Sequence, residues 1–162
     1  MRPPGLTAAL GAALFFLPAL TLGAECDLTG RTARVVDGDT LHLAVSAQKK
    51  VKIRLADIDT PERDQPYGRE ATQALSDLAY QGEICADVIT TDRYGREVAH
   101  LYQGDAWINQ ALVKQGAAWV YRKYAKAPYR RPLLEAEANA KKADRGLWAS
   151  DGAVPPWEWR RR

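Results

Sequence analysis

Two short acidic clusters in the first half of the chain have residue types and spacings that could perform chemistry on a charged substrate. The first is Asp37-Gly38-Asp39, within the stretch VVDGDTLHL at residues 35–43. The second is RLADIDTPER at residues 54–63, in which Asp57, Asp59 and Glu62 lie within six positions. Carboxylates at this density are typical either of a cation site or of ordinary turn and cap chemistry.

Each cluster taken alone has a purely structural explanation. Asp-Gly is among the strongest short signals for a hairpin, so Asp37-Gly38 could simply reverse the chain. Thr60-Pro61-Glu62 could begin a helix, with threonine as the cap and proline at the first position. Pro66 follows closely and would obstruct a helix begun there, which weakens the second explanation.

Together the clusters predict a cation site. Adjacent antiparallel strands of a barrel could bring Asp39 and Asp59 to one rim, where two carboxylates repel each other unless a cation lies between them. Ca²⁺ is the expected ion, because it takes oxygen ligands from carboxylates, carbonyls and water. His42 and His100 are isolated, so zinc is disfavoured and each is expected to be an ordinary strand residue.

Arg54 and Arg96 could supply the positive half of a phosphoryl-transfer site, because guanidinium groups donate forked hydrogen bonds to phosphate oxygens. The alternative is that both are surface charges. A regular strand raises a difficulty, since alternation would place Arg54 and Asp59 on opposite faces. We therefore predict a bulge or bend between Leu55 and Ile58, and a regular strand over residues 53–59 would count against the site.

The elements that must position these residues begin with three strands and a helix. Residues 31–36, 40–46 and 51–57 alternate and are rich in β-branched side chains, which predicts a three-stranded meander. From Glu70 onward the apolar residues recur with helical spacing, and Gly82 is the expected stop.

The second half of the chain predicts a hairpin and two more helices. Residues 83–90 and 97–103 return to strand patterns on either side of Tyr94-Gly95, a tight-turn signal. Asp105 is expected to cap a helix that ends at Gly116, and a third, mostly polar helix is expected over residues 132–144. This order predicts a five-stranded Greek-key barrel of the OB type with three helices.

The motifs resemble those of the staphylococcal nuclease (thermonuclease) family. They stand here as Asp37-Gly38-Asp39-Thr40, as Arg54 with Asp59-Thr60-Pro61-Glu62, and as Asp92-Arg93-Tyr94-Gly95-Arg96. Order and spacing match over roughly residues 31–148, including LVKQGAAWVY and the last helix leading to GLW. The resemblance implies an SNase-like OB-fold and a Ca²⁺-dependent nuclease. Its substrates would be DNA and RNA, preferably single-stranded, and its products would carry 3′-phosphates.

The same resemblance implies roles for the acidic residues. Asp39, Asp59 and the backbone carbonyl of Thr60 would hold the calcium ion, and Asp37 would order the turn behind them. Glu62 would orient or deprotonate the attacking water, a role that requires a short hydrogen bond to that water.

Arg54 and Arg96 would by the same likeness stabilise charge on the phosphate, a contribution whose loss typically costs about 10² to 10³ in rate. The nucleotide side departs from the family pattern, because Trp119 and Tyr121 stand where the best-known member has two tyrosines. Tyr94, Trp119 and Tyr121 are the candidate nucleic-acid contacts, since an aromatic ring stacks on any base. Core packing is the alternative for Trp119.

The first 24 residues are interpreted as a secretory signal peptide. An almost charge-free apolar segment over residues 6–22 ends in small residues, so we expect cleavage after Ala24 and one nuclease domain over residues 25–162. A membrane span is the second interpretation, because Pro18 interrupts a segment that barely reaches the about 20 residues required. Glu25 stands where lipid attachment at Cys26 would need a small residue. We expect a secreted or periplasmic monomer without a membrane anchor.

Charge and cysteines limit the partners and the compartment. The whole chain carries 23 Lys and Arg against 20 Asp and Glu, a mild net charge of +3 that does not by itself indicate a nucleic-acid binder. Export leads to an oxidising compartment, where Cys26 and Cys85 could form a disulfide. Two unpaired thiols are the alternative.

Two other classes of function compete with an enzyme. An inactive OB module could bind single-stranded nucleic acid or a protein partner, and a structural secreted module would explain the signal peptide and the cysteines only. The acidic and basic positions are all present, and a binding module gains nothing from carboxylates near a polyanion unless a cation neutralises them. The C-terminal VPPWEWRRR is expected to be a tail packed by Trp157 and Trp159 with solvated arginines, rather than a binding arm.

Overall fold

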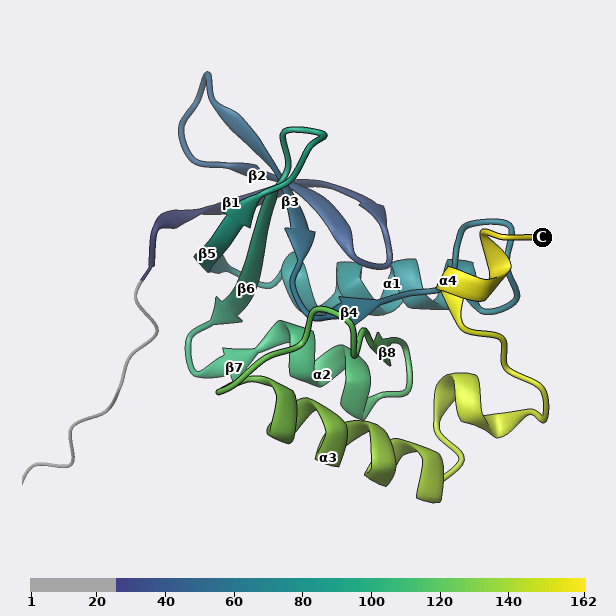
Figure 1. Ribbon diagram of the computed structural model, residues 1–162. Coiled ribbons are helices and arrows are strands. Elements are labelled where there is room, and N and C mark those ends of the chain that lie inside the picture. The colour runs from purple at the N-terminus through teal and green to yellow at the C-terminus, as the bar shows by residue number, and fades with distance from the viewer. Residues whose placement is uncertain (1–25) are drawn as a thin grey trace, which may run out of the picture.

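The computed structural model describes residues 26–162 of the protein (Figure 1). The segment interpreted as a signal peptide, with the cleavage site expected after Ala24, lies outside the described residues. Within residues 26–162, no helix is both long enough and apolar enough to cross a membrane.

Five strands close into a barrel. β1 (Leu28–Asp37), β2 (Thr40–Ala44) and β3 (Lys50–Leu55) form an antiparallel meander. β5 (Glu83–Thr91) pairs antiparallel with both β1 and β6 (Glu97–Gln103). A parallel pairing of β3 with β6 completes the ring, so the predicted five-stranded OB-type barrel is confirmed.

Helices cover one end of this barrel (Figure 1). α1 (Gly68–Ala79), α2 (Ile108–Lys114) and α3 (Arg130–Lys142) are the three expected helices, although α1 and α3 each begin two residues earlier than the sequence suggested. A 3₁₀ turn, η1 (Gly146–Ala149), and a one-turn helix, α4 (Pro156–Trp159), follow toward the C-terminus.

The expectation that Asp105 caps α2 is wrong. The chain stays extended for two more residues as β7 (Ala106–Trp107), which pairs with the end of β6. α2 therefore starts after Trp107, whose side chain makes no capping hydrogen bond. The strand pairing outweighed the local preference of aspartate for a cap position.

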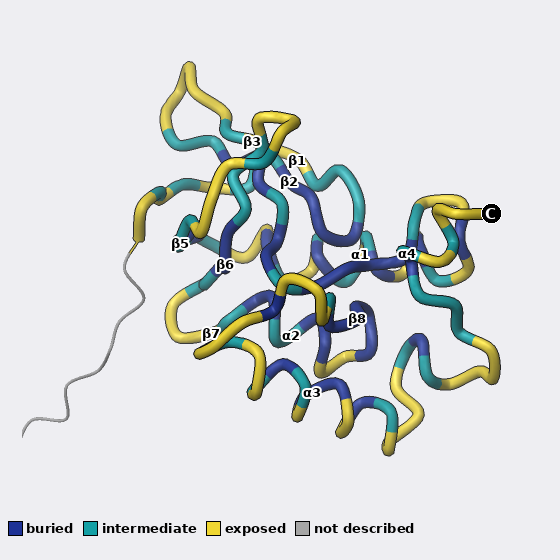
Figure 2. The backbone as a smooth tube through the Cα atoms, viewed as in Figure 1, coloured by how far each residue is buried: buried dark blue, intermediate teal, exposed yellow. Residues whose placement is uncertain are grey.

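The hydrophobic core fills the barrel and continues beneath it between the helices (Figure 2). Alternate strand residues and one face of each main helix contribute fully buried side chains, in agreement with the periodicities of the sequence. The largest of these are Leu41, Leu43, Ile53, Leu55, Ile58, Leu75, Ile84, Leu101, Ile108, Leu112 and Leu133.

A buried carboxylate on α3 anchors a second sheet, in which β4 (Ile58–Asp59) pairs antiparallel with β8 (Trp119–Val120). Glu137, with 2% of its surface exposed, accepts a hydrogen bond from the backbone N–H of Val120 at 2.9 Å. It also pairs with Arg122 at 2.5 Å and Lys141 at 3.1 Å. Burial alone would raise the pKa of Glu137, but the hydrogen bonds from Arg122 and Val120 and the charge of Lys141 hold it below its ordinary value. Glu137 therefore contributes stability while it is ionised.

Glu137→Gln should lower the free energy of unfolding by about 1–3 kcal/mol at neutral pH, because the buried side chain loses its ion pairs with Arg122 and Lys141. The folded pKa lies below the ordinary value of 4.5, so this contribution is present above pH 4.5 and is lost as the pH falls through the folded value. Urea denaturation of both proteins at neutral pH and at about pH 3 measures the difference, which should shrink at acidic pH. An undiminished difference would contradict the assignment.

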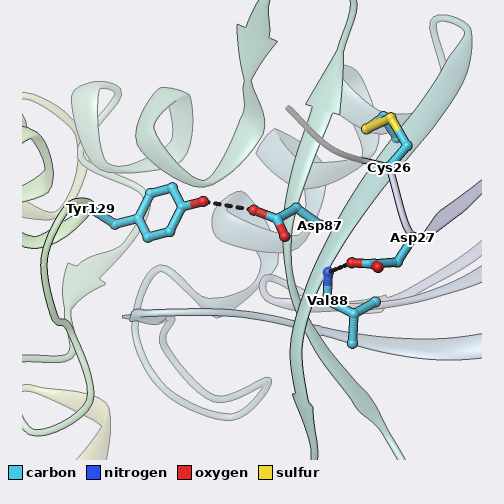
Figure 3. Close-up of a disulfide and its surroundings, with 6 residues drawn as sticks. Cys26, Asp27, Asp87, Val88 and Tyr129 are labelled. Atoms are coloured by element: carbon cyan, nitrogen blue, oxygen red, sulfur yellow. Dashed lines mark hydrogen bonds between the residues drawn. A yellow bond between two sulfur atoms is a disulfide. The ribbon is translucent and has the colours of Figure 1, made fainter. Parts of the chain in front are cut away.

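Cys26 and Cys85 form a disulfide that fastens the start of the described chain to β5 (Figure 3). Of the two alternatives left by the sequence, the structure has the paired one. The carboxylate of Asp27 reinforces the attachment by accepting a hydrogen bond from the backbone N–H of Val88 at 2.7 Å.

The Cys26→Ser/Cys85→Ser double variant should lose about 2–4 kcal/mol of unfolding free energy, because the bridge spans 59 positions and restricts the unfolded chain. Denaturant titration with and without a reducing agent measures this. The wild type should move to the midpoint of the variant on reduction, and the variant should not respond. A wild type insensitive to reduction would overturn the expectation.

Candidate active site

A sharp bend interrupts the strand that carries Arg54. β3 ends at Leu55, Asp57 adopts a φ of 63°, and the chain resumes as β4 (Ile58–Asp59). The bend predicted between Leu55 and Ile58 is therefore confirmed. It brings the carboxylate of Asp59 to the side of the barrel on which the Arg54 guanidinium lies.

Buried groups hold this bend from inside the fold. Asn109, which is fully buried, donates from Nδ2 to the carbonyls of Ala56 at 3.0 Å and Ala99 at 3.3 Å. Nε2 of the buried His100 lies 3.4 Å from the Asp57 carboxylate. Sequence reasoning missed both supporting roles, because a single buried amide or imidazole has no motif around it.

Asp39 and Asp59 share one positive partner at the rim. Nη2 of Arg54 lies 3.1 Å from Oδ2 of Asp39 and 3.0 Å from Oδ1 of Asp59. Nη1 of the same guanidinium donates to the backbone carbonyls of Leu55 at 2.6 Å and Ile58 at 3.0 Å. The bend thus positions the arginine, and the arginine joins the two carboxylates.

The turn Asp37-Gly38-Asp39 is both a hairpin turn and part of the site. Oδ1 of Asp37 accepts a hydrogen bond from the backbone N–H of Asp39 at 3.2 Å, which orders the turn. Oδ2 of Asp39 accepts from both the backbone N–H and the hydroxyl of Thr60, each at 3.0 Å. A Cβ at Gly38 would lie 2.7 Å from the Thr60 hydroxyl oxygen, so only glycine permits this approach.

The electrostatics of the rim favour additional positive charge. Burial raises the pKa of Asp59 above its ordinary value, against the opposing effects of Arg160 and Arg54. Burial, followed by the charge of Asp39, also raises the pKa of Asp37. Carboxylates whose ionised form is disfavoured in this way gain stability when a cation approaches them.

Glu62 lies in a tight loop between β4 and α1, next to the paired aspartates. Its backbone N–H donates to Oε1 of Gln65 at 3.1 Å. A Cβ on Gly68 would lie 1.9 Å from the Glu62 carbonyl oxygen, so the start of α1 presses directly against the loop. The Glu62 side chain remains 39% exposed, which leaves its carboxylate accessible to water.

Arg96 lies at the seam of the barrel, beside β3. It immediately precedes β6, and the register pairs Arg54 with Val98 two residues further on. Its Nε donates to Oδ2 of Asp92 at 2.7 Å, and its guanidinium lies 5.6 Å from the ring centre of Tyr94. Among residues 26–162 it makes no ion pair with the rim carboxylates. Arg96 therefore lies in the turn between β5 and β6, outside the acidic cluster.

The aromatic candidates differ in exposure. Tyr94 is 67% exposed on its turn. Trp119 is only 9% exposed and packs edge-on against Trp148 at 4.3 Å between ring centres. Of the two alternatives for Trp119, the structure therefore has core packing. Tyr121 is half-buried and its ring stacks on Trp157. Tyr94 and Tyr121 are therefore the candidate rings available for contact.

Sequence reasoning missed the arginine that enters the site from the C-terminus. Nη2 of Arg160 lies 2.7 Å from Oδ2 of Asp59, and Nη1 lies 2.5 Å from Oε1 of Glu62. All three tail arginines are exposed, but Arg160 also pairs with two carboxylates of the site, so the expectation of a merely solvated arginine is wrong for Arg160. A contact over 101 sequence positions leaves no local pattern to detect.

The donor set of the rim fits a hard cation held by few protein ligands. Asp39 and Asp59 offer carboxylate oxygens, and Thr60 stands against Asp39 through its N–H and hydroxyl. No group of three or more His, Cys, Asp or Glu side chains suited to a metal occurs in residues 26–162. A cation here would take two carboxylates, a carbonyl and water, which suits calcium and not zinc.

Comparison with known proteins agrees with this geometry. Residues 52–150 match the family described as staphylococcal nuclease homologue. An "uncharacterized endonuclease" of Escherichia coli O157:H7 is 42% identical over 137 residues, which cover 84% of this chain and 87% of that protein. A protein of Haemophilus influenzae with the same description is 39% identical over 145 residues, covering 88% and 80%. The "micrococcal nuclease" of Shigella flexneri is 36% identical over 151 residues, covering 88% and 86%.

A closed OB-type barrel whose rim joins carboxylates and arginines defines the class of this protein. Within that class, the chain belongs to the staphylococcal nuclease family.

Arg54→Gln should lower the free energy of unfolding by about 2–4 kcal/mol in the absence of divalent cations, because it leaves the Asp39 and Asp59 carboxylates without their shared counter-charge. Arg96→Gln is the matched control, since Arg96 pairs outside the acidic cluster. Thermal or urea denaturation in a chelating buffer measures both, and calcium should restore part of the loss in Arg54→Gln only. Equal stability of the two variants would show that Arg54 does not hold the rim together.

Proposed function

We propose that this nuclease is an exported, calcium-dependent phosphodiesterase that cleaves DNA and RNA and leaves 3′-phosphorylated products. The observation that carries the proposal is the bridging of Asp39 and Asp59 by one nitrogen of Arg54. This arrangement places acidic oxygens and a guanidinium in one small rim, which is the charge pattern needed to hold a cation and a phosphodiester together.

Asp39, Asp59 and the Thr60 carbonyl are the proposed ligands of calcium. When bound, calcium would supply positive charge next to the phosphate and reduce the repulsion between the carboxylates and the nucleic acid. A site with so few protein ligands is expected to bind calcium weakly, at about millimolar concentration.

Glu62 is the proposed base. Its carboxylate is accessible to water and close to Asp59, since Nη1 of Arg160 lies 2.5 Å from Glu62 and 3.4 Å from Asp59. A water hydrogen-bonded to Glu62 would give up its proton as its oxygen attacks phosphorus, and the 5′-oxygen would leave. The hydrogen bond from its backbone N–H to Gln65 orders the loop that carries Glu62.

Arg54 and Arg96 are the proposed phosphate ligands. Arg54 is fixed through Nη1 by two backbone carbonyls, so its guanidinium keeps its direction, and a phosphate would be bound by its Nε or by the Nη2 that now joins Asp39 and Asp59. Arg96 approaches from the neighbouring strand and would exchange its pairing with Asp92 for the phosphate. Fixed donors from two strands suit the trigonal-bipyramidal geometry of the reacting phosphorus.

The aromatic rings favour single strands as substrates. Stacking on Tyr121 or Tyr94 requires a base whose face is free, and bases in a duplex have theirs covered. Each such contact is worth about 1–3 kcal/mol and does not discriminate between bases. The disulfide supports export to an oxidising compartment, and we propose a secreted or periplasmic monomer.

Single-stranded DNA incubated with the protein at alkaline pH should be cleaved in millimolar calcium and remain intact with a chelator. Glu62→Gln and Arg96→Gln should each lower kcat by about 10²-fold or more, because one removes the base and the other a phosphate ligand. Glu70→Gln, an exposed acidic residue in the first turn of α1, is the control and should keep wild-type activity.

Two results would contradict the proposal. Intact substrate in calcium would favour the alternative of an inactive OB module that binds nucleic acid or a protein partner. Wild-type rates in Glu62→Gln would mean that the base has been assigned to the wrong residue.

A further inference from the structure

The last nine residues of the chain return to the candidate active site. We call residues 154–162 the C-terminal strap. It contains α4, which lies beside the loop that joins β4 to α1 (Figure 1). Two of its side chains, Trp157 and Arg160, contact residues to which calcium and nucleic acid have been assigned.

Arg160 pairs with the proposed metal ligand and the proposed base simultaneously. Its guanidinium makes two contacts to Asp59, at 2.7 Å and 3.4 Å, and one to Glu62 at 2.5 Å. A guanidinium in this position neutralises the carboxylate that would bind calcium. It also takes a hydrogen-bond position on Glu62 that the attacking water would need.

Trp157 covers the proposed base-stacking ring. Its indole lies parallel to the ring of Tyr121, with 4° between the planes and 5.3 Å between the centres. It also touches Trp119 edge-on at 5.9 Å. An aromatic ring flat against Tyr121 is the contact expected of a nucleic-acid base.

One helical turn places both groups on the same side of the strap. Trp157 and Arg160 are three positions apart, a spacing that puts side chains next to each other on a helix. The strap therefore presents a flat aromatic ring next to a cation. A bound nucleotide would likewise present its base next to the metal ion at its phosphate. The strap thus resembles a bound nucleotide and its metal ion in shape and in charge.

The strap is held at its start by a hydrogen bond and follows an exposed linker. Nε2 of the buried Gln65 donates to the carbonyl of Val154 at 2.6 Å, which fixes the point of entry. The preceding residues 150–152 are exposed, and Gly152 has a φ of 86° with no neighbour within 4 Å of a Cβ placed there. A cavity of about 260 Å³ separates this linker from the loop at Gln65. A change of backbone angles at Gly152 would let the strap move away once Pro156 and Trp157 leave their contacts with the body of the protein.

We propose that the C-terminal strap is an intramolecular inhibitor of the nuclease. Arg160 takes the position of calcium at Asp59 and Glu62, and Trp157 takes the position of a base on Tyr121. This inference rests on the proposed function of the same site. Calcium and single-stranded nucleic acid each compete with the strap, so either of them favours its release and thereby assists the binding of the other.

The competition has a measurable consequence for calcium. While the strap is docked, the apparent calcium affinity is reduced by the fraction of molecules in which Asp59 is accessible. Removing Arg160 should therefore tighten cation binding by about tenfold, within the usual range of coupling between two sites. The rate at saturating calcium should not change, because the strap has then already left.

The test compares Arg160→Gln with Arg161→Gln in the full-length protein. Arg161 carries the same charge one position away, and its side chain makes no ion pair among residues 26–162. Titration with terbium(III), a luminescent stand-in for calcium, measures cation affinity without substrate. Hydrogen exchange of residues 154–162 with and without calcium measures release of the strap, and cleavage of single-stranded DNA over a range of calcium concentrations gives the third readout.

The expected result has three parts. Arg160→Gln binds terbium about tenfold more tightly than wild type or Arg161→Gln. It reaches the same maximal rate at a lower calcium concentration. In the wild type, calcium increases the hydrogen exchange of the strap.

Two results would overturn the proposal. Equal terbium affinity in the three proteins would show that Arg160 does not compete with the cation. A lower maximal rate in Arg160→Gln at saturating calcium would show that Arg160 contributes to the reaction as a third phosphate ligand. A wild type that never cleaves DNA would reject the proposed function itself. That failure is distinct, because terbium affinity and hydrogen exchange are measured without catalysis.

Discussion

The central constraint of this structure is the mutual repulsion of two carboxylates held at one rim. Asp39 comes from a hairpin turn and Asp59 from the short strand after a bend, and the guanidinium of Arg54 makes their proximity tolerable. Several other features follow from this requirement. Gly38 lets the turn approach Thr60, and the buried Asn109 fixes the bend through two carbonyls. The barrel serves as the frame that keeps these groups in contact.

For the proposed function, the rim carboxylates have to exchange one positively charged partner, Arg160, for another, the calcium ion. Arg54 is tied to backbone carbonyls and stays, whereas Arg160 arrives on the C-terminal strap, which follows an exposed linker. In the proposed nuclease, the permanent cation preserves the geometry of the rim and the removable one occupies the place of the metal. The same two carboxylates can therefore contribute to stability in one state and to catalysis in another.

Much of the fold could be predicted because it depends on local patterns. Alternation predicts the barrel strands, and the conflict between a regular strand and a common face for Arg54 and Asp59 predicts the bend. The cap assigned to Asp105 failed because β7 paired with the end of β6, a non-local interaction. Arg160 was missed for a related reason, since its partners lie about a hundred positions earlier and no spacing rule reaches that far. For Trp119, the sequence allowed either packing in the core or stacking on a nucleic-acid base. Its burial in the structure decides for packing in the core.

The parallel seam between β3 and β6 also affects the order in which the protein assembles. The meander that carries Arg54 and the β5–β6 hairpin whose turn contains Arg96 are each local units, and their pairing requires closure of the longer loop between them. Contacts of this kind form late in folding, because the conformational entropy of the loop is lost before the strand pairing contributes favourable free energy. Arg54 and Arg96 come to the same seam of the barrel only when the ring is complete. A chain that has not yet closed the barrel therefore lacks the arrangement of charges on which the proposed nuclease activity depends.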